Sequence, residues 1–301
     1  MITSWITIVL VGHLANALAF VIDKILLTKS IPNPIAYTFF ISLLGLLVVV
    51  FIPFGVTIPA VGQILTSLAA GALFAVALLF FFAALRREET SRVIPFVGGT
   101  QPVVIFALSW LFLSEKLSQL QITALLLLIL GTIIISANLK TFLSFSSKGF
   151  MFAILASLFF AATFTLSKYV YNNIGFINGF FWSRWGAALL VLTFLLFPTA
   201  RQQIFASTDK TNKGTGLLFL TGQGLGALGA ILLNFAISLA SPTIVQAMQG
   251  IQYAFLFMLV IIFSQKFPQV LEEKLTTGLF LQKILAIVLI IGGLAMIGAN
   301  P

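Results

Sequence analysis

Polar side chains inside long apolar runs are the residues of this chain that could do chemistry. His13, Asn16 and Asp23 fall in or at the end of the first run and lie within about 80° of one another on a helix. Such a stripe predicts a proton- or substrate-binding surface, because polar groups are costly in lipid and normally face the interior of a bundle. The alternative is that His13 and Asn16 bond a neighbouring helix, while Asp23 sits at the membrane surface beside Lys24.

Uncharged polar side chains in three later runs are predicted to line a substrate cavity. They are Gln101 in the fourth run, Gln223 and Asn234 in the eighth, and Gln246, Gln249 and Tyr253 in the ninth. Those of the ninth run recur at i, i+3 and i+7 and therefore share one helical face. Amides bind carbonyl, hydroxyl and amine groups without burying a bare charge. The alternative is hydrogen bonding between helices, worth about 0.6 kcal/mol per contact.

Arg184 is the one strongly basic residue well within a run. It can bind an anionic group of a substrate or pair across the bundle. The alternative is that its side chain extends to the membrane surface, where its two flanking tryptophans are also common. Lys24 and Lys168 each close the first run of one half of the chain. With His13 and Asp23 they are predicted to act in coupling or gating.

Composition excludes several other kinds of chemistry. The chain has no cysteine and one histidine, so thiolate catalysis, Cys-ligated zinc and multi-His metal sites are absent. None of the seven carboxylates lies in the middle of a run, which disfavours exchange of a cationic drug for a proton at a buried acid. There is no Walker-type phosphate loop. We therefore predict no catalytic residue, no metal and no cofactor.

Membrane-spanning helices must position the polar residues. Hydrophobic residues make up 60% of the 301 residues and charged residues 8%, whereas a soluble domain has about a quarter of its residues charged. A span needs about 20 mostly apolar residues, and the chain offers ten such runs, which are apolar all round rather than alternating as in barrel strands. They lie near 2–22, 34–54, 61–85, 93–113, 119–139, 149–168, 174–198, 216–240, 243–263 and 278–299. The predicted fold is an all-α membrane protein with ten transmembrane helices.

The basic residues predict the topology. Thirteen of the sixteen Lys and Arg residues fall in or beside the loops that join runs one to two, three to four, five to six, seven to eight and nine to ten. Cytoplasmic loops carry the excess of positive charge, so these loops are predicted inside and both termini outside. The net charge of +9 therefore reflects topology, and no nucleic-acid partner is predicted.

The two halves of the chain resemble each other. GTIIISAN, which begins at Gly131, is similar to GLAMIGAN, which begins at Gly293. Each half holds five predicted spans, an odd number, so the second copy must be inserted upside down, as in many transporters. We predict two inverted five-helix repeats at 1–140 and 149–301, joined by a loop at 141–148. Such repeats can open a midplane site to either side.

Family-like spacing is found in the clearest stretch of the first half, at Pro102, Glu115, Gln121 and Gly131. With these residues the chain resembles the EamA-type ten-helix branch of the drug/metabolite transporter (DMT) superfamily. The second half departs from the pattern, since Gln265 stands at the glutamate position. The resemblance implies a secondary transporter, and it also implies both termini in the cytoplasm, opposite to the prediction from charge.

The leading prediction is an inner-membrane exporter or exchanger of small metabolites that works by alternating access. Amino-acid-like or weakly anionic solutes are favoured, because the intramembrane charge is basic. Expected partners are a small-molecule solute and membrane lipid, and the chain is expected to be a monomer or homodimer. The alternatives are a lipid-carrier flippase of the same fold, which a groove open to lipid would favour, and a membrane-embedded enzyme, for which the sequence offers only adjacent loop carboxylates.

Overall fold

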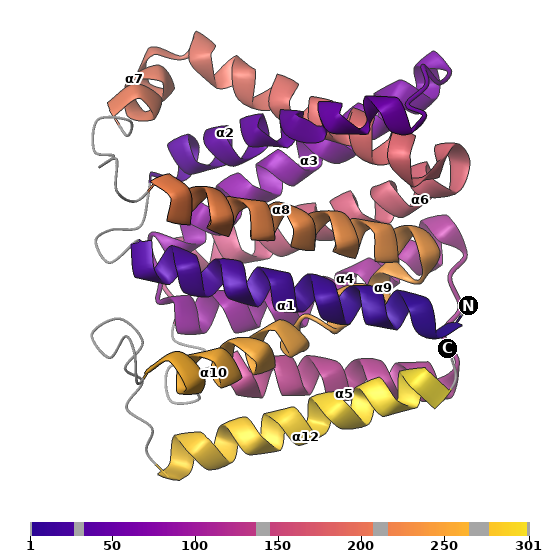
Figure 1. The fold of residues 1–301 in the computed structure, drawn as a ribbon, viewed down its shortest axis with the longest axis vertical. Coiled ribbons are helices and arrows are strands. Elements are labelled where there is room, and N and C mark those ends of the chain that lie inside the picture. The colour runs from indigo at the N-terminus through magenta and orange to yellow at the C-terminus, as the bar shows by residue number, and fades with distance from the viewer. Residues whose placement is uncertain (1, 27–32, 137–144, 207–215, 265–276, 300–301) are drawn as a thin grey trace.

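The structure, a computed structural model, describes residues 2–26, 33–136, 145–206, 216–264 and 277–299. Within these residues the chain forms helices and no strand, and most of the helices run side by side along one direction (Figure 1). The elements are α1 (Ile2–Leu26), α2 (Pro34–Leu44), the 3₁₀ helix η1 (Gly45–Phe54), α3 (Val61–Leu85), α4 (Thr90–Leu113), α5 (Gln119–Ser136), α6 (Ser147–Leu192), the 3₁₀ helix η2 (Thr193–Leu196), α7 (Pro198–Ala206), α8 (Gly216–Leu239), α9 (Pro242–Ala247), α10 (Gly250–Ser264) and α12 (Thr277–Ala299). The predicted all-α membrane fold is confirmed.

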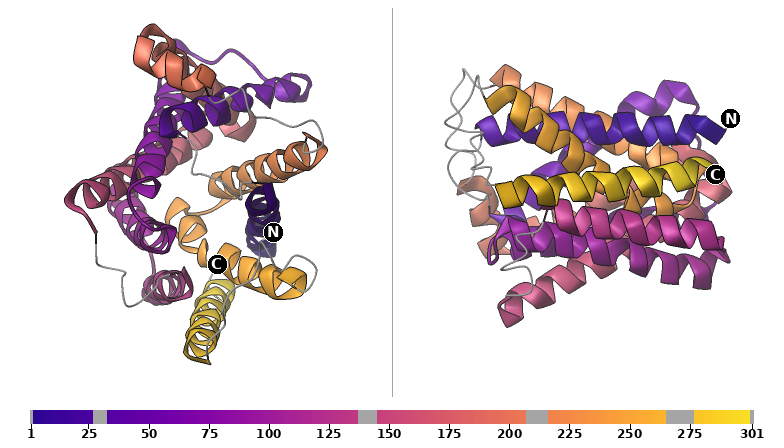
Figure 2. Two further views of the ribbon diagram at one scale, coloured as in Figure 1. Left: turned by 90° about the vertical axis from the view of Figure 1, so that its left-hand side faces the viewer. Right: turned by 90° about the horizontal axis from the view of Figure 1, so that it is seen from below.

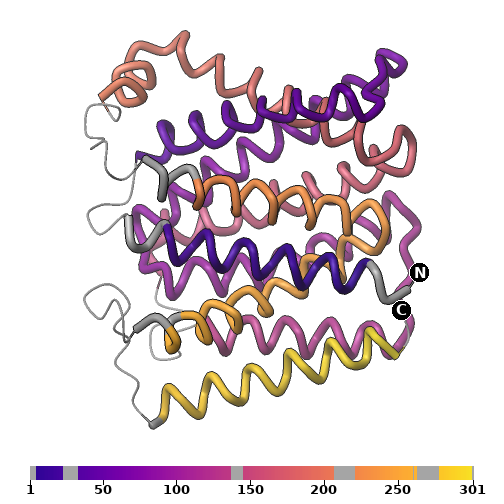
Figure 3. The backbone as a smooth tube through the Cα atoms, in the orientation of Figure 1, coloured from indigo at the N-terminus to yellow at the C-terminus, as the bar shows by residue number. Residues whose placement is uncertain are grey.

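The described residues contain eight helical segments long and apolar enough to cross a membrane. One of them, 147–196, has 50 residues and would be about 75 Å long if straight, more than twice the thickness of a bilayer core. It reverses at Gly175, where φ is 75° and ψ is 166°, a conformation that essentially only glycine adopts. The reversal divides α6 into a first arm, 147–174, and a second arm, 176–192, visible in the backbone trace (Figure 3). With the pair α9–α10, the described helices make ten passes.

Local chemistry sets several helix ends. The Asn33 side chain accepts a hydrogen bond from the Ile35 N–H at 3.0 Å, and Pro34 occupies the first helical position of α2, as expected for an N-terminus. Gly55 ends η1 with φ 95°, and Ser114 ends α4 with φ 54°. The span formed by α2 and η1 therefore covers 34–54, and α3 covers 61–85, as predicted from the sequence.

The outside of the bundle is apolar. Leu111 and Phe112 on α4 and Leu281 and Ile291 on α12 are all more than half exposed. Lipid tolerates such a surface, whereas a soluble monomer rarely exposes large apolar patches. The helices thus present to the membrane the side chains that composition predicted.

The described chain ends lie together. The start of α1 and the end of α12 are found at one end of the bundle (Figure 2), as an even number of passes requires. We call this the terminal end. The C-terminal ends of α1, α5 and α10 lie at the opposite end, together with α7 (Figure 1). The loops that carry most of the basic residues follow or precede these helix ends in sequence, so we call this the basic end.

The two halves pack through equivalent contacts. The helix α5 packs along α12 at one edge of the bundle (Figures 1 and 2), and α4 contacts α9. In addition α3 packs on α6, and α8 packs on α1. Exchanging the first five passes for the second five maps these contacts onto one another, which is the pattern of an inverted repeat. The second half begins with α6 at Ser147, inside the predicted loop 141–148. Part of that loop, 141–144, lies outside the described residues.

Candidate functional site

A hydrogen bond between two buried amides joins the halves of the protein. The Gln101 Nε2 group on α4 donates to Gln246 Oε1 on α9 at 3.2 Å, and both side chains are buried. Ser241 caps α9, accepting from the Ile244 N–H at 3.2 Å, and Pro242 follows it. Two predicted cavity residues are therefore brought together inside the bundle, each from a different repeat.

The ninth pass differs from the single helix predicted at 243–263. The helix α9 ends at Ala247 and α10 begins at Gly250, and across the break Gln249 N bonds Gln246 O at 3.2 Å in an i→i+3 turn. A Cβ at Gly250 would meet Thr132 and Ile290, so this glycine lets the broken pass approach α5 and α12 closely. An i→i+3 turn keeps Gln246 and Gln249 on the same side of the pass. Both lie against α4, with Gln246 bonded to Gln101 and the Gln249 Oε1 atom near Gly98.

A second polar group lies between α1 and α10. The imidazole of His13 is only 2% exposed and has the side chain of Gln252 beside it, although neither ring nitrogen makes a hydrogen bond in the described part of the chain. On the same helix as Gln252, Gln249 Nε2 donates to the Tyr253 hydroxyl at 3.0 Å. His13, Gln249 and Tyr253 thus belong to adjacent helices, one from each repeat.

Asn234 is the other predicted residue with a clear partner. Its Oδ1 accepts a hydrogen bond from the Tyr171 hydroxyl at 2.9 Å, and its Nδ2 group donates to Ala230 O at 2.9 Å. Tyr171 lies on the first arm of α6, four residues before the reversal at Gly175. Sequence reasoning missed Tyr171, although a run of polar residues from Lys168 onwards marked this stretch as unusual.

Arg184 lies inside the bundle on the second arm of α6. Its guanidinium carbon is 4.8 Å from the centre of the Phe74 ring and 4.6 Å from that of Phe180, and its methylene groups lie against Gly45. The side chain is therefore held between aromatic rings of α3 and α6, an arrangement that stabilises a cation. Its Nε atom makes no hydrogen bond with any described residue.

The charge of Arg184 has no matching carboxylate in the described part of the chain. The ion pairs found there join Arg92 to Glu88 and Glu89 at 3.3 and 3.1 Å, in the loop between α3 and α4. A partly buried charge without an opposite charge is costly.

A polar cluster lies at the terminal end, where residues of the two halves meet. Glu115, in the turn after α4, accepts hydrogen bonds from the hydroxyls of Ser241 and Thr243 at the start of α9. Lys168 on the first arm of α6 donates to Ser238 O at 3.1 Å, and it interacts electrostatically with Glu115. We call these five residues the terminal cluster. Lys168 was a predicted gating residue, whereas the roles of Ser241 and Thr243 were not foreseen.

The remaining predicted residues are less connected. Asn16 lies against Gly229 of α8, a packing position between two helices. Gln223 is half-buried on α8. The side chains of Asp23 and Lys24, at the end of α1, lie outside the described part of the structure, so the predicted stripe on α1 is described only at His13 and Asn16.

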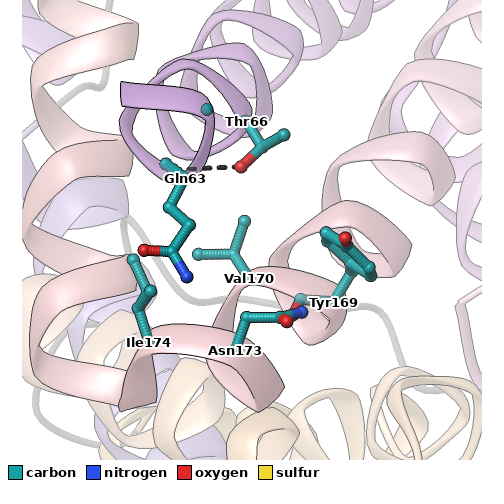
Figure 4. Close-up of a pocket in the computed structure, with 7 residues that line it drawn as sticks. Gln63, Thr66, Tyr169, Val170, Asn173 and Ile174 are labelled. Atoms are coloured by element: carbon teal, nitrogen blue, oxygen red, sulfur yellow. Dashed lines mark hydrogen bonds between the residues drawn. The ribbon is translucent and has the colours of Figure 1, made fainter. Parts of the chain in front are cut away.

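Two pockets lie along the boundary of α3 and α6. The first, of about 170 Å³, is lined by polar residues including Gln63, Thr66 and Asn173 (Figure 4). The second, of about 380 Å³, is lined almost wholly by apolar side chains of α3, α4 and α6. Neither pocket is lined by a predicted site residue.

Sequence comparison identifies the first half. The model of the EamA-like transporter family matches residues 3–137. The match covers a little less than half of the chain. This EamA-like half contains Gln101, Glu115 and His13, and it ends with α5. The resemblance noted from the spacing of its motifs is therefore confirmed.

Two further proteins are similar to the chain. The Bacillus subtilis (strain 168) protein named "Uncharacterized transporter YxxF" is 31% identical over 132 residues, which are 43% of this chain and 42% of the relative. The match thus spans less than half the length of that relative. A crystal structure superposes with a TM-score of 0.68 over 96% of this chain and 97% of its own, at 16% identity. That likeness extends the fold, and only the fold, beyond the EamA-like half.

Proposed function

We propose that this chain is a secondary transporter that moves a small polar solute across a membrane by alternating access. The observation that carries the proposal is that buried polar side chains from both repeats meet inside the bundle, with Gln101 bonded to Gln246. Intramembrane polar groups of this kind mark solute pathways, and a site between inverted repeats can open to either side. The family of the first half and the name of the Bacillus relative support the same function.

The uncharged solute-binding residues that we propose come from four passes. They are His13, Gln101, Asn234, Gln246, Gln249 and Tyr253, with Asn16 and Gln223 in more peripheral positions. None of these side chains carries a fixed charge, and only histidine ordinarily titrates near neutral pH. They can therefore form hydrogen bonds with the hydroxyl, carbonyl and amine groups of a solute. Arg184 adds one positive charge, and we propose that the solute is amino-acid-like or weakly anionic.

A lipid-carrier flippase is the second candidate, because the larger pocket is lined by apolar side chains of α3, α4 and α6 and is not enclosed. A flippase must also carry a polar headgroup across both leaflets. The lining of this pocket, from Leu73 on α3 to Leu113 on α4, extends only from the middle of the bundle toward the terminal end. A solute transporter therefore agrees better with the buried amides.

An enzyme agrees less well with the described carboxylates. Glu88 accepts hydrogen bonds from the Ser146 backbone and hydroxyl and caps the start of α6, and Glu115 belongs to the terminal cluster. Glu88 and the adjacent Glu89 also both pair with Arg92, so these carboxylates are engaged in contacts within the protein.

We propose the bacterial-type inner membrane as the location, with the basic end in the cytoplasm and both termini outside. The support is the distribution of Lys and Arg over the loops. A C-terminal fusion to a reporter that is active only in the cytoplasm tests the orientation. An inactive fusion is expected, and an active one reverses the orientation without changing the fold.

Reconstitution tests the proposed function. The purified protein is screened for thermal stabilisation by small amino acids, carboxylates, amines and amides, and each stabilising compound is then assayed for uptake into liposomes with and without a pH gradient. We expect at least one stabilising compound to enter liposomes that contain the protein faster than it enters protein-free liposomes. The Gln249→Ala and His13→Ala variants should each lower this uptake rate. Stabilising compounds that never cross the bilayer would contradict transport, and rates unchanged in both variants would remove these residues from the site.

A further inference from the structure

The smaller pocket is a polar site at the end of two helices. It lies between the first turns of α3, with Gln63 and Thr66, and the last turns of the first arm of α6, with Tyr169 and Asn173 (Figure 4). Gln63 lies two residues after the start of α3 at Val61, and Asn173 lies two residues before the reversal at Gly175. Helix ends of spans this long lie at the level of lipid headgroups.

The polar groups of this pocket are only partly used by the protein. Gln63 Oε1 accepts a hydrogen bond from the Ala60 N–H at 3.2 Å, and its amide group extends toward Val170 on α6 (Figure 4). Asn173 Nδ2 donates to Tyr169 O at 2.8 Å, which leaves Asn173 Oδ1 available as an acceptor. The pocket therefore offers both a donor and an acceptor to a ligand.

The larger pocket adjoins the smaller one at Tyr169, which lines both pockets. On α6 the shared wall runs through Asn173, Tyr169, Leu166 and Ala162, residues spaced by three or four and so on one helical face. On α3 it runs from Gln63 at the helix start to Leu73. One groove thus passes from headgroup level toward the middle of the bundle.

The lining changes along this groove in the order in which a lipid molecule changes. The end near Asn173 is polar, and the deep part is lined by apolar side chains such as Leu73 and Ala162, with Phe112 and Leu113 of α4 along the wall toward the terminal end. The volumes, about 170 and 380 Å³, give the greater share to the apolar part. A polar solute that binds the central amides would fit this groove poorly, because it would meet few polar groups beyond Tyr169.

We propose that this groove binds one membrane phospholipid, with its headgroup at Gln63 and Asn173 and one acyl chain along α6 toward Ala162. The site is separate from the proposed solute site, since no solute-binding residue lines it. It joins α3 and α4 of the first repeat to α6 of the second, so a bound lipid bridges the two halves of the bundle.

The headgroup chemistry follows from the lining. The seven residues that line the polar pocket carry no charge, and the neighbouring Lys168 directs its ammonium group to Ser238 O on α8. Amides and a phenol bind a zwitterionic headgroup through its phosphate oxygens and its ammonium hydrogens. The groove therefore favours phosphatidylethanolamine over phosphatidylglycerol, whose net negative charge finds no cation in the lining.

Native mass spectrometry of the full chain in detergent tests the proposal. Phosphatidylethanolamine, phosphatidylglycerol and a diacylglycerol with the same chains are titrated separately against wild type and three variants. Ala162→Trp fills the deep part of the groove, Asn173→Leu removes the polar acceptor, and Leu189→Trp places the same bulk on the second arm of α6, at a side chain 49% exposed and outside the groove.

We expect wild type to retain one phosphatidylethanolamine at least about fivefold more tightly than phosphatidylglycerol. Ala162→Trp should weaken that binding about fivefold or more, and Leu189→Trp should not change it. Asn173→Leu should weaken the binding of phosphatidylethanolamine and leave the binding of diacylglycerol unchanged. This comparison tests the proposal even if Ala162→Trp fails to fold. Equal retention of all lipids, retention unchanged by both groove variants, or equal loss in Leu189→Trp would overturn the proposal.

Discussion

Gly131 on α5 and Gly293 on α12 make the same contact with each other's helix. A Cβ at Gly131 would lie 2.6 Å from Ile290, and a Cβ at Gly293 would lie 2.8 Å from Leu128. Ile290 precedes Gly293 by three residues, and Leu128 precedes Gly131 by three residues. The two contacts are therefore related by a pseudo-two-fold axis, and they involve the two glycines that begin the repeated sequence motif.

Alanine at either glycine is expected to destabilise the α5–α12 pair. Gly131→Ala and Gly293→Ala should each lower the free energy of unfolding by about 1–3 kcal/mol, because overpacking forces the helices apart. Thermal unfolding in detergent measures the loss. Gly292→Ala is the matched control, since its Cβ would meet only Leu127 at 3.9 Å and alanine favours the helix. Equal effects at 292 and 293 would contradict the reciprocal contact.

Replacement of Arg184 tests whether the solute carries a negative charge. Arg184→Gln should weaken the binding of a carboxylate solute at least about tenfold, as expected when a buried ion pair loses its cation, and should leave the matched amide unaffected. The carboxylate affinity of Arg184→Lys should lie between those of wild type and Arg184→Gln, because lysine keeps the charge but lacks the planar guanidinium group. Isothermal titration calorimetry measures the affinity of each variant for the carboxylate and for the matched amide.

A second cation provides the control for Arg184. Lys283 on α12 also sits over an aromatic ring, with its ammonium 4.5 Å from the centre of Phe257, and Lys283→Gln should not alter carboxylate binding. Binding of a carboxylate that is equally tight in Arg184→Gln and wild type would show that Arg184 is structural.

The Gln101–Gln246 bond is expected to behave as a pair. Gln101→Leu or Gln246→Leu alone leaves one buried amide without its partner and should destabilise the protein by about 1–2 kcal/mol. The double variant should recover part of that loss, while all three should transport more slowly. A thermal-unfolding double-mutant cycle measures the coupling. Strictly additive losses would mean that the two amides act independently.

The terminal cluster is expected to hold the terminal end closed. Glu115→Gln weakens the bonds to Ser241 and Thr243, and a loss of about 1.4 kcal/mol would raise the open population about tenfold. Because the chain has no cysteine, a single Ala240→Cys reports the opening through its rate of thiol labelling. Glu89→Gln, at the opposite end, should leave the rate unchanged. A rate that falls or stays constant in Glu115→Gln would remove the gating role.

Several details of the fold followed from the sequence because they depend on local chemistry. Pro34 begins α2, Gly55 ends η1 and Pro59 shortly precedes α3, and the backbone preferences of proline and glycine act locally. The break between Ala247 and Gly250 was not predicted, since it depends on how closely α10 approaches Thr132 and Ile290. Periodicity predicted that Gln246 and Gln249 share a face, and both side chains lie against α4 despite the break.

The sequence by itself determined that the chain is a multi-pass helical membrane protein with an EamA-like first half, because apolar content, span length and charge distribution are summed over many residues. The tertiary structure alone decided that Gln101 meets Gln246, that Tyr171 meets Asn234 and that Phe74 and Phe180 enclose Arg184. These partners lie far apart in sequence. Pairing at such separation depends on the register of whole helices against one another, and a residue pattern within one helix carries no information about that register.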